Sequence, residues 1–219
     1  MSRALDAKKK DLRAVSTQLK EMIAADGGGV TVKNAVHLHG LCGGLRSGEI
    51  TIEGNSGDYL GVLNDGALIR VTGNAGKYVA DNMTRGTMLV DGDTDYGAGQ
   101  YCYGGTVVVK GSAGDFTATM NKGATIIIGK DVGDEVGTYM LAGDLVIVGN
   151  AGHNLGNYLI RGNIYVGSQW ASLGHNIKEE PLTEADVDKL QGYFAKYAIK
   201  ADPLAFHKLV PLSEKPFYK

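Results

Sequence analysis

One short phrase recurs through the middle of the sequence and constrains the fold more than any other feature. Each copy holds a few β-branched or aliphatic residues between glycines, as in Gly48-Glu-Ile-Thr-Ile-Glu-Gly54. The glycines that close the seven copies are 19, 19, 19, 18, 20 and 18 residues apart, and they are Gly54, Gly73, Gly92, Gly111, Gly129, Gly149 and Gly167. A period of this size indicates a repeat architecture, in which no single unit can bury its apolar side.

Each repeat has room for one strand and no room for a long helix. Apolar residues alternate within the phrases, as Ile50 with Ile52 and Leu145 with Ile147, so they lie on one side of a strand. One strand per turn, stacked in parallel on the next, predicts an all-β fold: a single-stranded parallel β-helix of about seven coils of 18–20 residues each. Helices are expected to flank the coils at both ends.

The recurring glycines are interpreted as structural turn residues. A coil corner requires either a positive φ or close approach of two backbones, and a Cβ atom opposes both. Besides the seven closing glycines, a second set follows three or four residues later in five repeats. This second set consists of Gly57, Gly76, Gly114, Gly133 and Gly152.

A left-handed hexapeptide helix has a coil of similar length and is the alternative fold to consider. That fold requires an aliphatic residue at every sixth position, but stepping on from Ile52 gives Asp58 and Asn64. The sequence therefore does not fit a hexapeptide helix, and the acyltransferase function associated with that fold is excluded.

Counting back from each closing glycine predicts which side chains face outward. The positions one and three before the glycine are polar in the early repeats, such as Thr51 and Arg70. In the later repeats they are all apolar: Ile126, Ile128, Val146, Val148, Ile164 and Val166. Such a patch is too large to face water on a monomer, so we expect a cover, either the C-terminal helix or a partner subunit.

The chain divides into three predicted regions. Residues 1–29 read as an amphipathic helix that either caps the β-helix or docks on a partner, and residues 30–176 form the β-helix. Residues 177–219 form a helix and an extended tail. The helix is expected to begin with Thr183 as N-cap and Asp186 in the capping-box position. The tail ends in Phe217-Tyr218-Lys219 and is expected to contact a neighbouring subunit.

No catalytic, cofactor-binding or metal site is predicted in this chain. His37 and His39 share a strand face but lack the further ligands that zinc requires. The acidic corner at residues 91–95 lacks the glycine and the terminal carboxylate of a calcium loop. Cys42 and Cys102 differ in repeat phase and are interpreted as reduced thiols near the core. They are too few to hold an iron–sulfur cluster.

The charge and hydropathy patterns exclude other classes of partner. A net charge of −2 and a pI near 6.2 provide no basic surface for nucleic acid or anionic lipid. The sequence contains no apolar run of membrane-spanning length. We therefore expect a cytoplasmic protein that binds neither nucleic acid nor membranes.

Four glycine blocks carry a family resemblance. They are Gly54-Asn-Ser-Gly57, Gly73-Asn-Ala-Gly76, Gly111-Ser-Ala-Gly114 and Gly149-Asn-Ala-Gly152. They resemble the GXGXG domain at the C-terminal end of the large subunit of glutamate synthase, over about residues 30–176. The small GXGXG subunit of N-methylglutamate synthase is the most similar in length and ending. The same β-helix also occurs as a subunit of formylmethanofuran dehydrogenase.

The resemblance implies a non-catalytic scaffold subunit within a hetero-oligomer. The implied partners are a glutamine amidotransferase-like subunit and an FMN-containing synthase subunit that also holds an iron–sulfur cluster. The first-choice reaction joins glutamate and methylamine, and ordinary glutamate synthesis is the second choice. The alternative is a scaffold in a formylmethanofuran dehydrogenase-like or formyltransferase/hydrolase complex, and a third hypothesis is a self-contained enzyme acting on polysaccharide.

Overall fold

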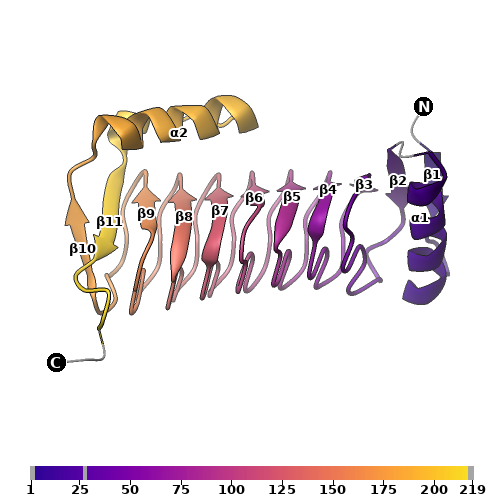
Figure 1. Cartoon of the computed structure of the whole chain (residues 1–219), viewed down its shortest axis with the longest axis horizontal. Coiled ribbons are helices and arrows are strands. Elements are labelled where there is room, and N and C mark those ends of the chain that lie inside the picture. The colour runs from indigo at the N-terminus through magenta and orange to yellow at the C-terminus, as the bar shows by residue number, and fades with distance from the viewer. Residues whose placement is uncertain (1–2, 27–28, 217–219) are drawn as a thin grey trace.

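The chain folds into an elongated stack of coils, with one helix at its N-terminal end and a second helix lying along the later coils (Figure 1), as described by a computed structural model for residues 3–26 and 29–216. The elements in chain order are β1 (Arg3–Asp6), α1 (Leu12–Asp26), β2 (Val30–Lys33), β3 (Glu49–Glu53), β4 (Asp65–Val71), β5 (Arg85–Val90), β6 (Thr106–Val109), β7 (Lys122–Ile128), β8 (Ala142–Ile147), β9 (Asn163–Val166), β10 (Ile177–Glu180), α2 (Glu184–Tyr197), the 3-10 turn η1 (Pro203–Ala205) and β11 (His207–Pro211). The predicted parallel β-helix of about seven turns is confirmed.

The strands form one sheet in the order β1-β2-β3-β4-β5-β6-β7-β8-β9-β11-β10. All neighbours from β1 to β9 are parallel, and each coil contributes one strand. Because the pairing is in register, equivalent residues of successive coils form ladders along the stack. The sheet therefore presents one inner face to the core and one outer face along the whole stack.

Two inner ladders of apolar side chains fill the core. The first consists of Ile50, Ile69, Met88, Val107, Ile126, Leu145 and Ile164, and the second of Ile52, Val71, Val90, Val109, Ile128, Ile147 and Val166. Their exposed fractions are all at or below 1%. Burial of one such side chain contributes about 1.5–3 kcal/mol, so these ladders supply much of the stabilisation of the coils.

The closing glycines make room for side chains of the preceding coil. Asn55 Oδ1 accepts a hydrogen bond from Asn74 N at 2.9 Å, and Asn74 Oδ1 accepts one from Asp93 N at 2.9 Å. A Cβ at Gly73 or Gly92 would overlap the accepting Oδ1 and the backbone of the preceding closing glycine. The Gly-Asx pair therefore acts as a unit, because the glycine lets two coils approach and the Asx side chain bonds across the gap.

Positive φ falls on a different set of glycines from the one predicted as turn residues. Of the closing glycines only Gly54 has a positive φ, at 87°, whereas the glycines that open the phrases all have one. These openers are Gly48, Gly66, Gly86, Gly105, Gly123, Gly143 and Gly162. The second set is needed for close approach. A Cβ at Gly76, Gly133 or Gly152 would overlap an aspartate Oδ1 of the preceding coil, and at Gly57 or Gly114 it would overlap backbone atoms.

The corner after each second glycine contains non-glycine residues in the left-handed region. In one coil these are Tyr78 at 58°, Ala80 at 59° and Asn82 at 55°. The N–H groups of Tyr78 and Asn82 donate to the next coil, and that of Ala80 donates to the preceding coil. Each left-handed residue has a strain cost of about 1–3 kcal/mol, which these hydrogen bonds between coils offset.

The N-terminal region differs from the single predicted helix. Residues Arg3–Asp6 form strand β1, which pairs in parallel with β2, and α1 begins only at Leu12. Leu5, assigned by sequence to the helix, is buried in the core as part of the sheet. Val15 and Leu19 of α1 are also buried in the core cluster, so the apolar side of this helix packs against the first coils of its own chain.

The C-terminal region is also more regular than the predicted extended tail. The capping box of α2 is confirmed, with Thr183 as N-cap and Asp186 as its partner. Beyond α2, β11 inserts antiparallel between β9 and β10 and continues the sheet. The sequence pattern missed both strands because they are short and lack the glycine phrase. Phe217-Tyr218-Lys219, predicted to contact a neighbour, lies outside the described residues.

Gly111 tests the close approach of neighbouring coils. Its φ is not positive, but a Cβ there would overlap Asp93 Oδ1 and the carbonyl oxygen of Gly92. We expect Gly111→Ala to lower the free energy of unfolding by about 1–3 kcal/mol through overpacking. The matched control is Gly192→Ala in α2, where a Cβ meets nothing within 4 Å and helix propensity should raise stability by up to about 1 kcal/mol. Equal denaturation midpoints for the two variants would contradict the steric argument.

Candidate functional site

The outer face of the sheet changes character along the stack. One outer ladder, given by the strand register, runs Thr51, Arg70, Leu89, Val108, Ile127, Val146 and Tyr165. Helix α2 lies across the later strands of this face, as Figure 1 shows. Val108, Ile127, Val146 and Tyr165 form a second buried cluster with Leu190, Phe194 and Phe206. The expected cover of the apolar patch is therefore the chain's own C-terminal helix.

The predicted outward set was partly wrong. Ile126, Ile128, Ile164 and Val166 face the inner core, whereas Ile127 and Tyr165 face outward under α2. The error arises because Gly129 and Gly167 directly follow the last inward-facing residue of the strand, whereas one more residue separates the other closing glycines from it. Ile128 pairs with Val109 of the preceding coil, so Gly129 occupies the place that Lys110 holds there. Counting back from the glycine therefore shifts these two coils by one residue, which reverses every side chain.

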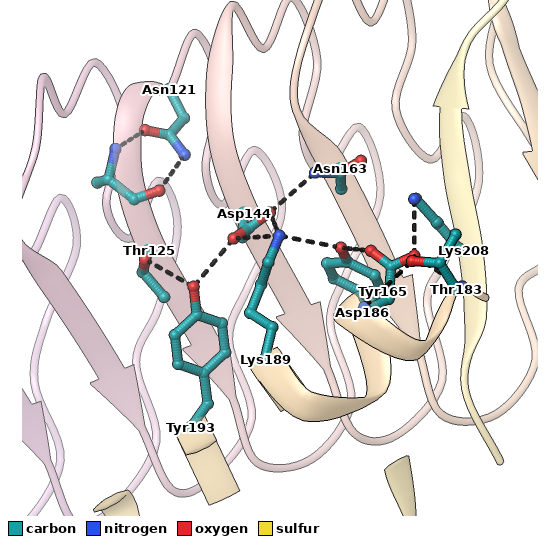
Figure 2. A network of polar contacts seen from close by, with 11 residues as sticks. Asn121, Thr125, Asp144, Asn163, Tyr165, Thr183, Asp186, Lys189, Tyr193 and Lys208 are labelled. Carbon is teal, nitrogen blue, oxygen red and sulfur yellow. Dashed lines mark hydrogen bonds and ion pairs between the residues drawn. The ribbon is translucent and has the colours of Figure 1, made fainter. Parts of the chain in front are cut away.

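Polar side chains at one edge of the covered face form a network (Figure 2). Its first centre is Asp144, at the start of β8. Asp144 Oδ2 accepts a hydrogen bond from the Tyr193 hydroxyl at 2.9 Å and lies 3.2 Å from Lys189 Nζ. Asp144 Oδ1 accepts one from Asn163 Nδ2 at 3.0 Å. Lys189 and Tyr193 both come from α2, so this carboxylate fixes the middle of the helix to the sheet.

The second centre of the network is Asp186, in the first turn of α2. Its Oδ2 accepts hydrogen bonds from Lys208 Nζ at 2.8 Å and from the backbone and hydroxyl of Thr183 at 2.9 and 2.7 Å. Its Oδ1 accepts one from the Tyr165 hydroxyl at 2.6 Å. Lys189 Nζ lies 3.3 Å from the same hydroxyl and so joins the two centres (Figure 2).

The electrostatics of the network follow from its burial. Burial opposes ionisation of Asp186, but the hydrogen bonds from Lys208, Tyr165 and Thr183 outweigh it and hold the pKa of the carboxyl well below its usual value. Burial, with the bond donated to Asp186, raises the pKa of the Tyr165 hydroxyl far above its usual value. Burial also raises the pKa of Tyr193 to about 12. Both tyrosines thus stay neutral donors and Asp186 stays an anion.

This chemistry suits attachment of a helix better than catalysis. Each carboxylate accepts several bonds from its own chain, and both hydroxyls are already donating to carboxylates. The sequence pattern gave Asp186 only a capping role and missed the rest of the network. A signal was present, because Asp186, Lys189 and Tyr193 follow one another at helical spacing beside the apolar stripe.

The prediction that His37 and His39 share a strand face is wrong, because both lie in the turns and bends that follow β2. His37 Nε2 contacts Lys10 O at 3.0 Å, while His39 Nδ1 accepts a bond from Asp58 N at 3.0 Å. Burial raises the pKa of both Cys42 and Cys102 to about 12, so neither is an activated thiol.

The described part of the chain offers neither a metal site nor a membrane-spanning helix. Within residues 3–26 and 29–216, no group of three or more His, Cys, Asp or Glu side chains could hold a metal ion. No helix in these ranges is both long and apolar enough to cross a membrane.

Comparison with known families decides the relationship. A family model described as the GXGXG motif matches residues 13–200, from α1 through every coil to the end of α2. The chain belongs to the GXGXG family. The GXGXG domain is a non-catalytic region of glutamate synthase-type proteins. Among curated proteins, none matches the chain.

The cover over the outer face of this GXGXG chain can be tested within one ladder. Val146 is fully buried under α2. Thr51 lies in the same ladder on β3, three coils away from β6, where the buried apolar cluster begins. We expect Val146→Asp to lower the free energy of unfolding by about 3–5 kcal/mol, since a charge is buried without a partner. Thr51→Asp should change it by less than about 1 kcal/mol. Similar melting temperatures for both variants would contradict the assignment of the covered face.

The polar network predicts a pH dependence of stability. Because the folded-state pKa of Asp186 is depressed, its contribution is fully present above the unfolded value of about 3.9 and is lost as the pH falls toward the folded pKa. We expect Asp186→Asn to lower the free energy of unfolding at pH 7 by about 2–4 kcal/mol. The variant should also lose less stability on acidification than the unmodified chain does. Asp188→Asn, an exposed carboxylate on the same helix, is the control. The idea fails if the two variants give the same urea midpoints between pH 2 and 7.

Proposed function

We propose that this chain is a non-catalytic scaffold subunit of a glutamate synthase-type enzyme complex. The observation that carries the proposal is the family match over residues 13–200, which includes the coils and both helices. The polar groups of the described residues support it, because those that resemble catalytic groups are engaged in holding α2. The two thiols are buried and have raised pKa values.

The stacked coils are suited to holding partner subunits at fixed separations. Each coil is bonded to the next along its strand and at its corners, so the stack resists bending between sites. A scaffold that fixes two active sites can shorten and enclose the route of a small intermediate such as ammonia between them. The chain itself then contributes position and shape, and its partners contribute the chemistry.

The finer assignment concerns the reaction and the partners. We propose a glutamine amidotransferase-like subunit and an FMN-containing synthase subunit with an iron–sulfur cluster, in a cytoplasmic hetero-oligomer. N-methylglutamate synthesis from glutamate and methylamine is the proposed reaction. It rests on the resemblance of the glycine blocks, such as Gly54-Asn-Ser-Gly57, and of the Ser172-Leu-Gly174 region to the GXGXG subunit of that enzyme.

Isolation of the native complex tests the proposal. The tagged chain, expressed at its natural level, should retain an amidotransferase-like protein and a flavoprotein through gel filtration in constant ratio, identified by mass spectrometry. The preparation should convert glutamate and methylamine into N-methylglutamate, with release of one ammonia per product. Retention of a formyltransferase or a molybdopterin-containing protein instead would overturn the assignment.

The chain alone is expected to bind neither FMN nor an iron–sulfur cluster. It has two cysteines, both buried, and a cluster requires at least three ligands. Titration of the isolated chain with FMN, followed by flavin fluorescence, should leave the emission unchanged, and metal analysis should find no iron. The flavin-containing complex is the positive control. A stoichiometric flavin or iron content in the isolated chain would contradict the assignment of both cofactors to a partner subunit.

A further inference from the structure

A groove lies beside the first turn of α2, where this helix meets β10, β11 and η1. We call it the C-terminal groove, and its volume is about 620 Å³. Its lining includes Glu184 and Asp188 of α2, Leu204 of η1, and Phe206 and Lys208. Val187 of α2 also lines this groove.

An exposed leucine stands at the rim of the groove on a rigid turn. Leu204 is 71% exposed and lies in η1. Pro203 fixes the start of this turn, and the Asp202 side chain accepts a hydrogen bond from Leu204 N at 3.0 Å. Because the backbone of this turn is already fixed, ordering it on binding costs little conformational entropy, which favours Leu204 as a contact residue in an interface.

The charges around the groove are mainly negative. Four carboxylates line it, from Glu179, Glu180, Glu184 and Asp188. The one lysine in the lining is only 14% exposed at its side chain, and its Nζ is bonded to the buried Asp186. Its positive charge is therefore largely neutralised by Asp186 and does not offset the negative charges of the carboxylates around the groove.

Two of the rim carboxylates have partners and two have none among the described residues. Glu179 contacts His207 Nδ1 at 2.7 Å, and Glu180 contacts Lys178 Nζ at 2.6 Å. Glu184 and Asp188 are exposed on α2 and make no side-chain bond within residues 3–26 and 29–216. Both project from the helix that forms one wall, so an unpaired acidic wall faces the apolar residues of η1.

We infer that the C-terminal groove binds a basic amphipathic segment of a partner subunit, with an apolar side chain against Leu204 and Phe206 and lysine or arginine beside Glu184 and Asp188. The occupant follows from charge complementarity, since an acidic wall rejects acidic segments and attracts basic ones. The inference deepens the proposed scaffold function by naming the chemistry of one partner contact. A contact of this kind would lie at the end of the stack, next to the hollow lined by Trp170 and His207.

A pair of labelled peptides tests the chemistry directly. In one, lysines flank a leucine–tryptophan centre, and in the other glutamates replace the lysines. Fluorescence anisotropy with the full chain should show binding of the lysine peptide about tenfold tighter than of the glutamate peptide. Leu204→Asp, and the double variant Glu184→Lys with Asp188→Lys, should each weaken the lysine peptide by about tenfold.

Matched variants control for general surface effects. Leu63→Asp removes another leucine that is 56% exposed, and Glu21→Lys with Glu49→Lys reverses two exposed carboxylates elsewhere. These controls should leave the affinity for the lysine peptide within about twofold. Equal binding of the two peptides, or an equal loss in the groove and control variants, would overturn the inference.

Photo-cross-linking in the native complex identifies the occupant. A benzophenone amino acid at position 204 should cross-link to a segment with an apolar residue flanked by lysine or arginine. Such a segment from a protein unrelated to glutamate synthase would support the groove while refuting the proposed function. A cross-link to an acidic segment or to a second copy of this chain would overturn the inference. So would the lack of any cross-link at position 204 in a complex that is otherwise intact.

Discussion

The structure depends on how closely each coil approaches the next. At the corners this distance leaves no room for a Cβ, as at Gly73, and the Asx side chain beside the glycine bonds across the same gap. The corner bonds and the strand pairing together hold successive coils in register. Without that register, equivalent residues would not form ladders, and neither the core nor the outer face would exist as continuous surfaces. The family's glycine pattern is thus a requirement of stacking.

The outer face follows from the same register. A ladder whose members were all polar would leave the sheet open to solvent, and one whose members were all apolar would need a cover along its full length. Here the ladder changes at Leu89, and α2 extends only over the apolar part. Asp144 and Asp186 then hold the helix in one position, because each carboxylate must be satisfied by particular donors on the opposite element.

The sequence alone could predict the repeat, the parallel stacking and the capping box at Thr183, because each of these leaves a local signal in residue spacing. It could not predict the register of the coils ending at Gly129 and Gly167. The spacings of 18, 20 and 18 residues show that these repeats depart from the regular period, but they do not show whether the glycine or the strand has moved. The left-handed corners at Tyr78 and similar positions were also beyond prediction, because hydrogen bonds between coils impose them against local preference. Strands β1 and β11 depend on partners distant in sequence and leave no periodic trace.

The direction of β11 has a consequence for the length of the molecule. A stack of parallel coils presents at its last strand a template on which another parallel coil, from the same or a different chain, can be added. Strand β11 occupies that template in the opposite sense, pairing with β9 on one side and β10 on the other. Among the described strands the outermost at this end is β10, where Lys178, Glu179 and Glu180 place charges along the strand. The number of coils is therefore terminated by the chain itself, and end-to-end polymerisation through sheet extension is disfavoured at this end.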